Sequence, residues 1–423
     1  MKRSYLYLSE FHVGDKFTTL SRTVTETDVV LFAGITGDNN PIHTDKIYAE
    51  SLPFNIQNVK IVKDVVSVPV IGVGRMNDPA LMLSALRTGA MDFVALGRES
   101  VCDPHLPEKI KEGRLDEILT CTGCMQRCLY PNSFEEGFGI SCMINPFSGK
   151  EHIWEITPAE KKKKIAVVGA GPVGLQAAWI LAKRGHEVKV YEKEITAGGQ
   201  YRLAAVPAMK QELAKTISTY LTFCKKYGAE VIYGVKATKE MLEQEGFDEI
   251  ILACGAQPLV PRIPGIDGEN VYLANQVLSF DVRLSGQKIL VLGAGLVGAE
   301  AAEVLSTYGN KVTVVDMLDK AAPLAPLRPR ENLLSRLDKA GVGFYLNSRV
   351  CEIRPDGIRY EQNGETKEMT GFDSIVLAFG SRSDKALETE YEGDHRIHSV
   401  GDCLTAGDAK KGIYEATKLA MVL

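Results

Sequence analysis

The sequence has no apolar run long enough to cross a bilayer, for which a helix needs about 18 or more residues. Its start, MKRSYLYLSEF, has no apolar core of the kind found in secretory signals. A large excess of one charge is also absent, because the net charge is only −5 and acidic and basic residues are mixed along the chain. We therefore expect a cytoplasmic protein with no membrane partner and, without a basic stripe, no nucleic-acid partner.

A disulfide framework is missing too. Nine cysteines in 423 residues are too few for a disulfide-dense secreted scaffold. Four of them instead share one loop with the spacing C-x2-C-x3-C-x13-C, at Cys121, Cys124, Cys128 and Cys142. Such a loop can hold tetrahedral zinc or an iron–sulfur cluster, and the spacing alone does not choose between these or free thiols. In a reducing compartment the clustering favours a metal site.

A glycine-rich motif follows the cysteine loop, in KIAVVGAGPVGLQAAWILAKRGHEVKVYEKE at residues 164–194. A predicted strand leads into Gly169, Gly171 and Gly174, followed by a predicted helix and a second strand that ends at Glu192. The glycines permit a tight turn, close approach of a pyrophosphate and tight helix–sheet packing. The helix N-terminus favours the phosphates, and the acid is placed to accept hydrogen bonds from ribose hydroxyls. The motif predicts a dinucleotide site.

A second copy appears in KILVLGAGLVGAEAAEVLSTYGNKVTVVDML, with Gly293, Gly295, Gly298 and Asp316 in the same order. Two copies predict two dinucleotide sites, although a duplicated fold with one inactive site would give the same pattern. The acid at the end of the second strand favours an unmodified ribose, and no arginine follows it at once to meet a 2′-phosphate. We therefore expect NADH rather than NADPH.

The arrangement resembles the flavoproteins with two dinucleotide-binding domains. The resemblance implies an FAD-binding domain at residues 165–275 and 371–423, and an inserted NAD(P)H-binding domain at 276–370. It also implies that Gly199 and Gln200 of EKEITAGGQ, and Asp402 of HSVGDC, contact the flavin nucleotide. Cys254 stands where the family often has threonine, and we expect it to pack as a small apolar residue. No C-x-x-C lies near the flavin segments, which argues against a disulfide reductase.

With two redox nucleotides in one chain, the cysteine loop at 111–150 favours an iron–sulfur cluster over zinc, because a cluster accepts the single electrons that a flavin releases. The loop CTGCMQRC…ISCMINP also resembles that of bacterial dienoyl-CoA reductases and related iron–sulfur flavoenzymes of the old-yellow-enzyme type. The resemblance implies a 4Fe-4S cluster.

In that family a TIM barrel that binds FMN precedes the cluster, and residues 59–110 resemble its last two βα units. PVIGVGRMNDP places Gly74 and Arg75 after one predicted strand, and DFVALGRESVCDP places Gly97 and Arg98 after the next. Loops after the last two barrel strands commonly bind phosphate, so these residues are predicted to hold FMN. Surface arginines on ordinary turns are the alternative. Two strands cannot close a barrel, and the family's substrate-reducing residues have no counterpart here.

Residues 1–50 resemble the start of MaoC-like hydratases with the hot-dog fold. The segment DNNPIH contains Asp38 and His43, the pair that the resemblance implies for hydration of an unsaturated thioester. The rest of such a domain is missing, so we expect an inactive remnant joined near residues 51–58.

We predict an α/β protein with two Rossmann-like dinucleotide-binding domains (FAD and NAD(P)H), preceded by an iron–sulfur loop, a partial TIM barrel and a partial hot-dog segment. The resemblance implies an oxidoreductase that takes electrons from NADH through FAD and the cluster to FMN, and reduces enoyl or dienoyl double bonds. The partner is then a small-molecule substrate or electron acceptor. Three alternatives remain: an electron-transfer module that serves a protein or dye acceptor, an inactive chimera, and a hydratase fusion.

Overall fold

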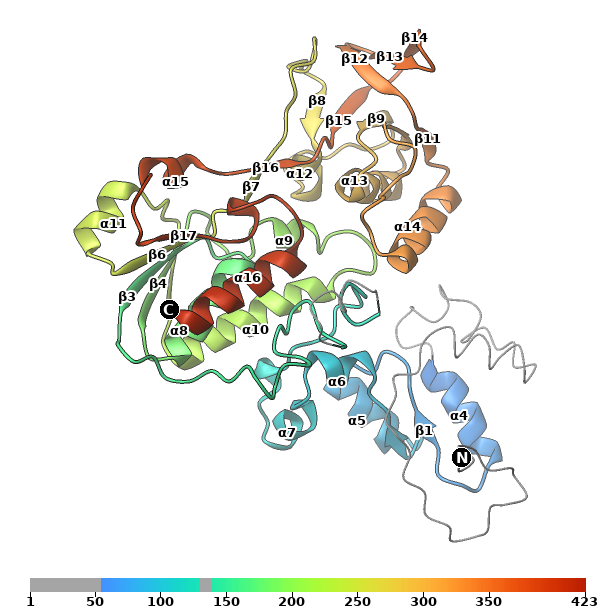
Figure 1. Ribbon diagram of the computed structural model, residues 1–423. Coiled ribbons are helices and arrows are strands. Elements are labelled where there is room, and N and C mark those ends of the chain that lie inside the picture. The colour runs from blue at the N-terminus through green and yellow to red at the C-terminus, as the bar shows by residue number, and fades with distance from the viewer. Residues whose placement is uncertain (1–54, 130–138) are drawn as a thin grey trace, which may run out of the picture. The chain divides into compact units, whose positions relative to one another are not determined.

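The computed structural model describes residues 55–129 and 139–423, all of which belong to the unit Glu50–Leu423 (Figure 1). Asp38, His43 and the predicted hot-dog segment lie outside these residues, so the hydratase resemblance stays a prediction. Within the described ranges, none of the helices combines the length and the apolar character needed to span a bilayer.

The segment before the cysteine loop contains the two predicted βα units. Its strands, β1 and β2, pair in parallel and are only two residues long each. Asp78 caps the helix after β1 by accepting a hydrogen bond from the Ala80 amide at 2.9 Å. The elements of this segment are α4 (Asn55–Val65), β1 (Ile71–Gly72), α5 (Pro79–Arg87), β2 (Phe93–Val94), α6 (Arg98–Cys102), α7 (Leu106–Lys111) and the 3-10 turn η2 (Leu115–Glu117).

A five-stranded parallel sheet with the order β17-β6-β3-β4-β5 forms the first dinucleotide-binding domain. Its first strand is central, as in a doubly wound α/β fold. The strands are β3 (Lys164–Val168), β4 (Glu187–Glu192), β5 (Glu230–Tyr233), β6 (Glu249–Leu252) and β17 (Ile397–Ser399). Its helices are α8 (Pro172–Lys183), α9 (Gln200–Leu203), α10 (Glu212–Tyr227), α11 (Lys239–Glu245), α15 (Ala386–Glu390), η4 (Gly401–Cys403) and α16 (Ala409–Val422).

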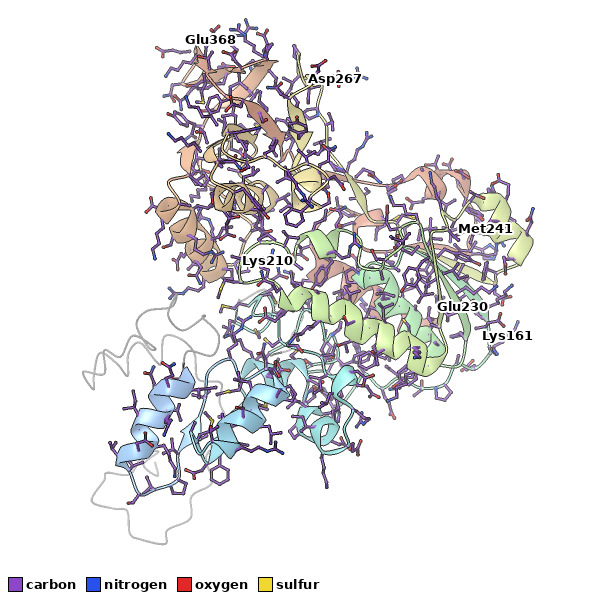
Figure 2. All side chains as sticks on the ribbon, turned by 180° about the vertical axis from the view of Figure 1, so that it is seen from behind. Lys161, Lys210, Glu230, Met241, Asp267 and Glu368 are labelled. Carbon is purple, nitrogen blue, oxygen red and sulfur yellow. The ribbon has the colours of Figure 1, made fainter. Side chains whose placement is uncertain are left out.

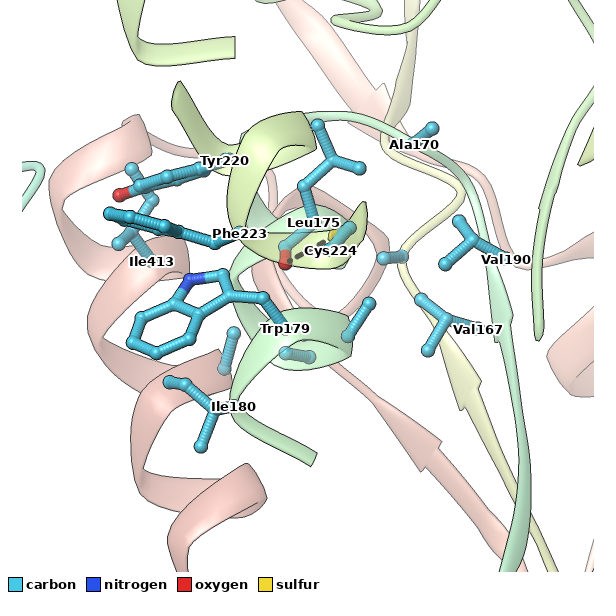
Figure 3. Close-up of a cluster of buried hydrophobic side chains, with 14 of the residues drawn as sticks. Val167, Ala170, Leu175, Trp179, Ile180, Val190, Tyr220, Phe223, Cys224 and Ile413 are labelled. Atoms are coloured by element: carbon cyan, nitrogen blue, oxygen red, sulfur yellow. Dashed lines mark hydrogen bonds between the residues drawn. The ribbon is translucent and has the colours of Figure 1, made fainter. Parts of the chain in front are cut away.

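Helix α8 lies between α10 and α16 and is buried along almost its whole length (Figure 3). Trp179 packs against Phe223 of α10, with ring centroids 5.2 Å apart. The Trp179 indole nitrogen donates to Gln176, whose own amide donates to Thr417 of α16, both at 2.9 Å. The three helices therefore form one core on this face of the sheet, in which Trp179, Gln176 and Thr417 are linked by hydrogen bonds.

A second five-stranded parallel sheet, with the order β11-β10-β9-β15-β8, forms the second dinucleotide-binding domain. An antiparallel three-stranded sheet, β12-β13-β14, follows β11, and Glu368 in Figure 2 lies on its last strand. The elements are β8 (Val271–Leu273), α12 (Ala274–Leu278), β9 (Lys288–Leu292), α13 (Leu296–Thr307), β10 (Lys311–Val315), α14 (Leu327–Lys339), β11 (Gly343–Tyr345), β12 (Arg349–Arg354), β13 (Gly357–Gln362), β14 (Glu365–Thr370) and β15 (Ser374–Leu377).

The second sheet is larger than the predicted inserted domain, 276–370. It includes β8 and β15, which the sequence analysis assigned to the flavin domain. The two connecting segments instead pair with each other as the antiparallel strands β7 (Ala256–Pro258) and β16 (Ser381–Ser383). The prediction missed this because a buried apolar strand such as β15 carries no signal for which of two parallel sheets it joins.

Candidate functional site: two nucleotide loops and a cysteine loop

The first glycine loop runs from the end of β3 to the start of α8. Gly169 has a φ of 107°, and a Cβ atom there would collide with the carbonyl of Ala253. Gly174 packs against the carbonyl of Gly169, so a side chain there would push the helix off the strand. At Gly171, the residue before α8, a Cβ atom would meet no atom within 4 Å. The backbone at the helix N-terminus is therefore open to an anion such as a pyrophosphate.

Other predicted flavin residues gather around this helix N-terminus. An ideal Cβ atom on Gly199 would lie 3.9 Å from Cα of Gly171. The side-chain amide of Gln200 donates to the carbonyl of Ala256 at 2.5 Å, which ties this segment to β7. Gly401, the residue before Asp402, packs against Val173 in the first turn of α8.

Two acids complete the first site. Glu192 is buried, and its oxygen atoms accept hydrogen bonds from the amides of Ala170 at 2.8 Å and Glu194 at 2.9 Å. A carboxylate has about four acceptor positions, so Glu192 can still accept from a ribose hydroxyl. Asp402 accepts from the Gly407 amide at 3.0 Å, and burial raises the pKa of this carboxyl group.

The second glycine loop repeats this geometry. Gly293 has a φ of 114°, and Gly298 packs against its carbonyl. Gly295 precedes α13 and, like Gly171, would place a Cβ atom in open space. Asp316 accepts hydrogen bonds from the amides of Ala294 at 2.5 Å and Leu318 at 2.8 Å, as Glu192 does in the first loop. Both loops thus keep the arrangement that a bound dinucleotide requires.

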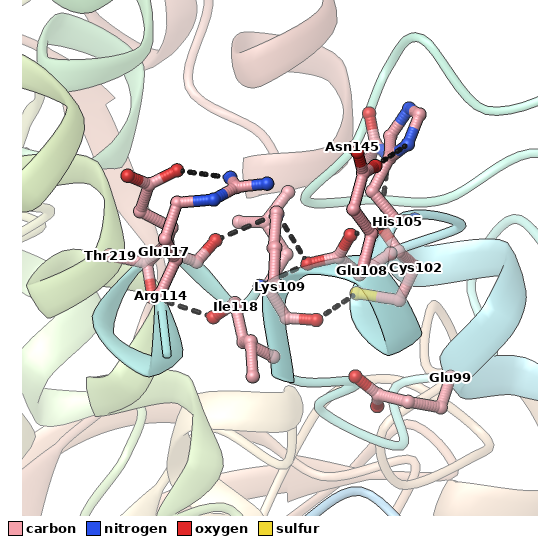
Figure 4. Close-up of polar contacts among 12 residues, drawn as sticks. Glu99, Cys102, His105, Glu108, Lys109, Arg114, Glu117, Ile118, Asn145 and Thr219 are labelled. Atoms are coloured by element: carbon pink, nitrogen blue, oxygen red, sulfur yellow. Dashed lines mark hydrogen bonds and ion pairs between the residues drawn. The ribbon is translucent and has the colours of Figure 1, made fainter. Parts of the chain in front are cut away.

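The cysteine loop is held by one face of α10. The hydroxyl of Thr219 donates to the carbonyl of Ile118, three residues before the first cysteine ligand, at 2.9 Å, a contact drawn in Figure 4. The hydroxyl of Tyr220 donates to the carbonyl of Ile144, two residues after the last cysteine ligand, at 2.7 Å. The same helix therefore supports both ends of the loop and the core of the first nucleotide domain.

The four predicted ligands lie near one another. The pKa values of Cys121 and of Cys128 are raised to about 12, chiefly by burial. For Cys128 the neighbouring thiols Cys124, Cys121 and Cys142 contribute to this rise. For Cys142 the neighbouring Cys102 thiol and three backbone amides lower the pKa. Among the described residues, no three His, Cys, Asp or Glu side chains are arranged to hold a single metal ion. The ligands of a cluster bind different iron atoms, so they need not converge on one point as zinc ligands do.

These thiols fit a group that carries positive charge. Buried thiols with raised pKa values are neutral and inert, whereas metal binding requires thiolates and stabilises them. Arg98 is close enough to lower the pKa of Cys121, Cys124 and Cys128, although burial outweighs this effect. The donor set therefore suits an iron–sulfur cluster.

The two arginines predicted to bind FMN have different surroundings. Gly97 precedes α6, and Arg98, the first residue of that helix, has one buried guanidinium nitrogen without a hydrogen-bond partner. Arg75 instead forms an ion pair with Glu212 of α10 at 2.9 Å, with 9% of each side chain exposed. Its guanidinium also lies against Gly123 of the cysteine loop. Despite this ion pair, the Nε atom of Arg75, like one guanidinium nitrogen of Arg98, has no hydrogen-bond partner among the described residues, and the FMN site stays a prediction.

The contact partners of two residues in this region were not predicted. Glu99 accepts a hydrogen bond from the Cys121 amide at 2.8 Å, and burial raises its pKa to about 8. Cys254 lies in one apolar cluster with Cys403, which supports its predicted packing role. The partners of Glu99 and of Cys254 are far away in the sequence, so no local pattern indicates either contact.

Two family models match the chain. Residues 163–402, more than half of its length, match the model described as pyridine nucleotide-disulphide oxidoreductase. Residues 17–117 match the NADH:flavin oxidoreductase / NADH oxidase family. The second match includes part of the segment 1–50 that resembles hydratases.

Individual proteins are similar over most of the chain. An NADH oxidase from Thermoanaerobacter brockii is 34% identical over 82% of this chain and 55% of its own length. A cinnamate reductase from Clostridium sporogenes is 33% identical over 87% of the chain and 55% of its own length. The solved structure of a 2-naphthoyl-CoA reductase complex has a TM-score of 0.83 and 30% identity, and the match covers 89% of this chain and 58% of that one.

The chain thus spans a little over half the length of the curated relatives it matches. The match over 163–402 covers both glycine loops and ends at Asp402. The two sheets, the paired loops and this match agree, and the chain belongs to the pyridine nucleotide-disulphide oxidoreductase family.

Proposed function

We propose that this chain passes electrons from NADH through FAD and a 4Fe-4S cluster to FMN or another acceptor, and that its substrates are enoyl or dienoyl thioesters. The observation that carries the proposal is the shared support of two sites by α10. This helix packs on α8 behind the first glycine loop, and it holds both ends of the cysteine loop.

Each site then has a defined task. The N-terminus of α8 and Gly171 would bind the FAD pyrophosphate, with Glu192 on the ribose, while Gly295 and Asp316 would do the same for NADH. Cys121, Cys124, Cys128 and Cys142 would hold the cluster. When bound, FAD accepts two electrons from NADH as a hydride, and a cluster carries single electrons.

The substrate class comes from the relatives. Their names specify cinnamate and 2-naphthoyl-CoA, which are an unsaturated acid and an aromatic acyl thioester. Such compounds share a conjugated acyl group, so we infer an acceptor of that class. FMN on Gly74, Arg75, Gly97 and Arg98 would be the group that delivers the electrons to it, and this step depends on barrel strands that the described residues do not include.

The test is the cofactor content of anaerobically purified protein, followed by NADH oxidation assays. We expect FAD and about four irons with matching sulfide per chain. Bound FMN together with NADH-dependent reduction of an enoyl thioester would support the full proposal. FAD and iron without FMN, with activity only toward a dye acceptor, would restrict the chain to electron transfer. Zinc in place of iron would contradict the proposal.

A further inference from the structure

Tyr201 connects the first nucleotide loop with the cysteine loop. It follows Gly199 and Gln200 directly and is the second residue of α9. Its amide donates to the carbonyl of Gly198 at 3.1 Å, and an ideal Cβ atom on Gly199 would lie 3.9 Å from Cα of Gly171. The backbone that carries Tyr201 therefore belongs to the predicted flavin site.

The side chain of Tyr201 points into the protein, away from solvent. It is 8% exposed and belongs to the same buried cluster against which Cys121, Cys124 and Cys142 pack. Burial, and then the charge of Cys124, raise the pKa of Tyr201. The ring thus lies between the flavin loop and the thiols, and its hydroxyl group stays protonated.

The hydroxyl group of Tyr201 is the unusual feature. It is buried, and the neighbouring Thr216 hydroxyl on α10 is close enough to lower the pKa of Tyr201. Neither hydroxyl makes a hydrogen bond of normal geometry with the residues that the structure describes. The neighbouring buried tyrosine, Tyr220, donates its hydroxyl to the carbonyl of Ile144 at 2.7 Å. Buried polar groups are nearly always paired, so an open donor next to a predicted cofactor site indicates that the cofactor supplies the acceptor.

We propose that the Tyr201 hydroxyl donates a hydrogen bond to a sulfur atom of the cluster bound at Cys121, Cys124, Cys128 and Cys142, and thereby raises the reduction potential of that cluster. Hydrogen bonds to the sulfur atoms are one of the features that set the potential of an iron–sulfur cluster, because they stabilise the added negative charge of the reduced form. Tyr201 is then a positioning residue that tunes electron transfer. The inference rests on the proposed function, since it requires the cluster.

The experiment compares the wild-type protein with Tyr201→Phe and with the control Tyr360→Phe, which changes a buried tyrosine of β13 in the second dinucleotide-binding domain. Each holoprotein is purified anaerobically, its iron and FAD are counted, and the cluster is titrated with a reductant while its spectrum is followed by electron paramagnetic resonance. We expect Tyr201→Phe to keep FAD and iron and to be reduced at a lower potential. A loss on the order of tenfold in the reduction equilibrium corresponds to about 59 mV for one electron. Tyr360→Phe should keep the wild-type potential.

An unchanged potential in Tyr201→Phe with full iron content would overturn the inference and leave the proposed function intact. Absence of iron from the wild-type protein would overturn the proposed function itself. If Tyr201→Phe loses its iron, Tyr201→His, which keeps a ring donor, decides the question. Retention of the cluster in Tyr201→His supports the hydrogen bond, and loss of the cluster in both variants contradicts it.

Discussion

Glu212→Gln should destabilise the first nucleotide domain strongly. The substitution leaves the Arg75 guanidinium buried without its counter-charge, because the two side chains are 2.9 Å apart and each is only 9% exposed. Breaking a buried ion pair by removing one partner costs about 3–5 kcal/mol, and the residual exposure favours the lower end of that range. With a urea dependence of roughly 3 kcal/mol per M, the midpoint should fall by about 1 M.

Tryptophan fluorescence reports this unfolding well. The chain has two tryptophans, and one of them, Trp179, packs against Phe223 of α10, the helix that begins at Glu212. FAD must be saturating in every sample, because a ligand that binds the native state shifts the midpoint by itself.

Two controls make the result interpretable. Glu230→Gln removes an exposed carboxylate at the start of β5 in the same domain and should change stability by less than about 0.5 kcal/mol. The double variant Arg75→Met with Glu212→Leu should recover most of the loss, because apolar residues can replace a buried ion pair. A midpoint for Glu212→Gln equal to that of Glu230→Gln would refute the reasoning.

Three further outcomes are expected. Cys124→Ala should lose iron but keep FAD, whereas Cys351→Ala on β12 should keep both; iron analysis decides this, and full iron in Cys124→Ala would contradict the cluster assignment. Asp316→Ala removes an acceptor of backbone and ribose hydrogen bonds and should raise the KM for NADH about 10- to 100-fold with FAD unchanged; an unaltered KM would place NADH elsewhere. Burial lowers the pKa of His186 below its usual 6.5, and its Nδ1 accepts from the Lys163 amide. Stability should therefore fall as the pH drops below 6.5. If the urea midpoint of His186→Phe depends on pH as steeply as that of the wild-type protein, this expectation is contradicted.

Both nucleotide loops were predictable because their requirements are local. A strand, three glycines and a helix follow one another without interruption, and each glycine has a steric reason within the same unit. Gly169 and Gly293 have positive φ angles, and Gly174 and Gly298 each pack against the carbonyl of the loop's first glycine. The acids were also placed correctly at the ends of their strands, although their hydrogen bonds to Ala170 and Ala294 follow only from the folded structure.

The contacts between segments could not be predicted. Arg75 is predicted to hold the FMN phosphate because glycine and arginine follow a strand, and that role stays a prediction. Its ion pair with Glu212, on a helix far along the chain, has no signal in the sequence. Nothing in the sequence near Glu212 distinguishes it from a solvated acid at a helix N-terminus. Tyr201 likewise has no local signal, since an aromatic residue after two glycines is more commonly part of a core.

The buried face of α10 explains why the two sites belong together. Glu212, Thr216, Thr219, Tyr220 and Phe223 are all buried and follow the spacing of one helix face. Along this face the helix pairs with the segment after β1, holds both ends of the cysteine loop and packs against Trp179 of α8. Because α8 begins at the first glycine loop, the separation between that loop and the four cysteines is fixed by a single helix rather than by the linkers between domains. Electron transfer between a flavin and a cluster at these positions then needs no domain movement.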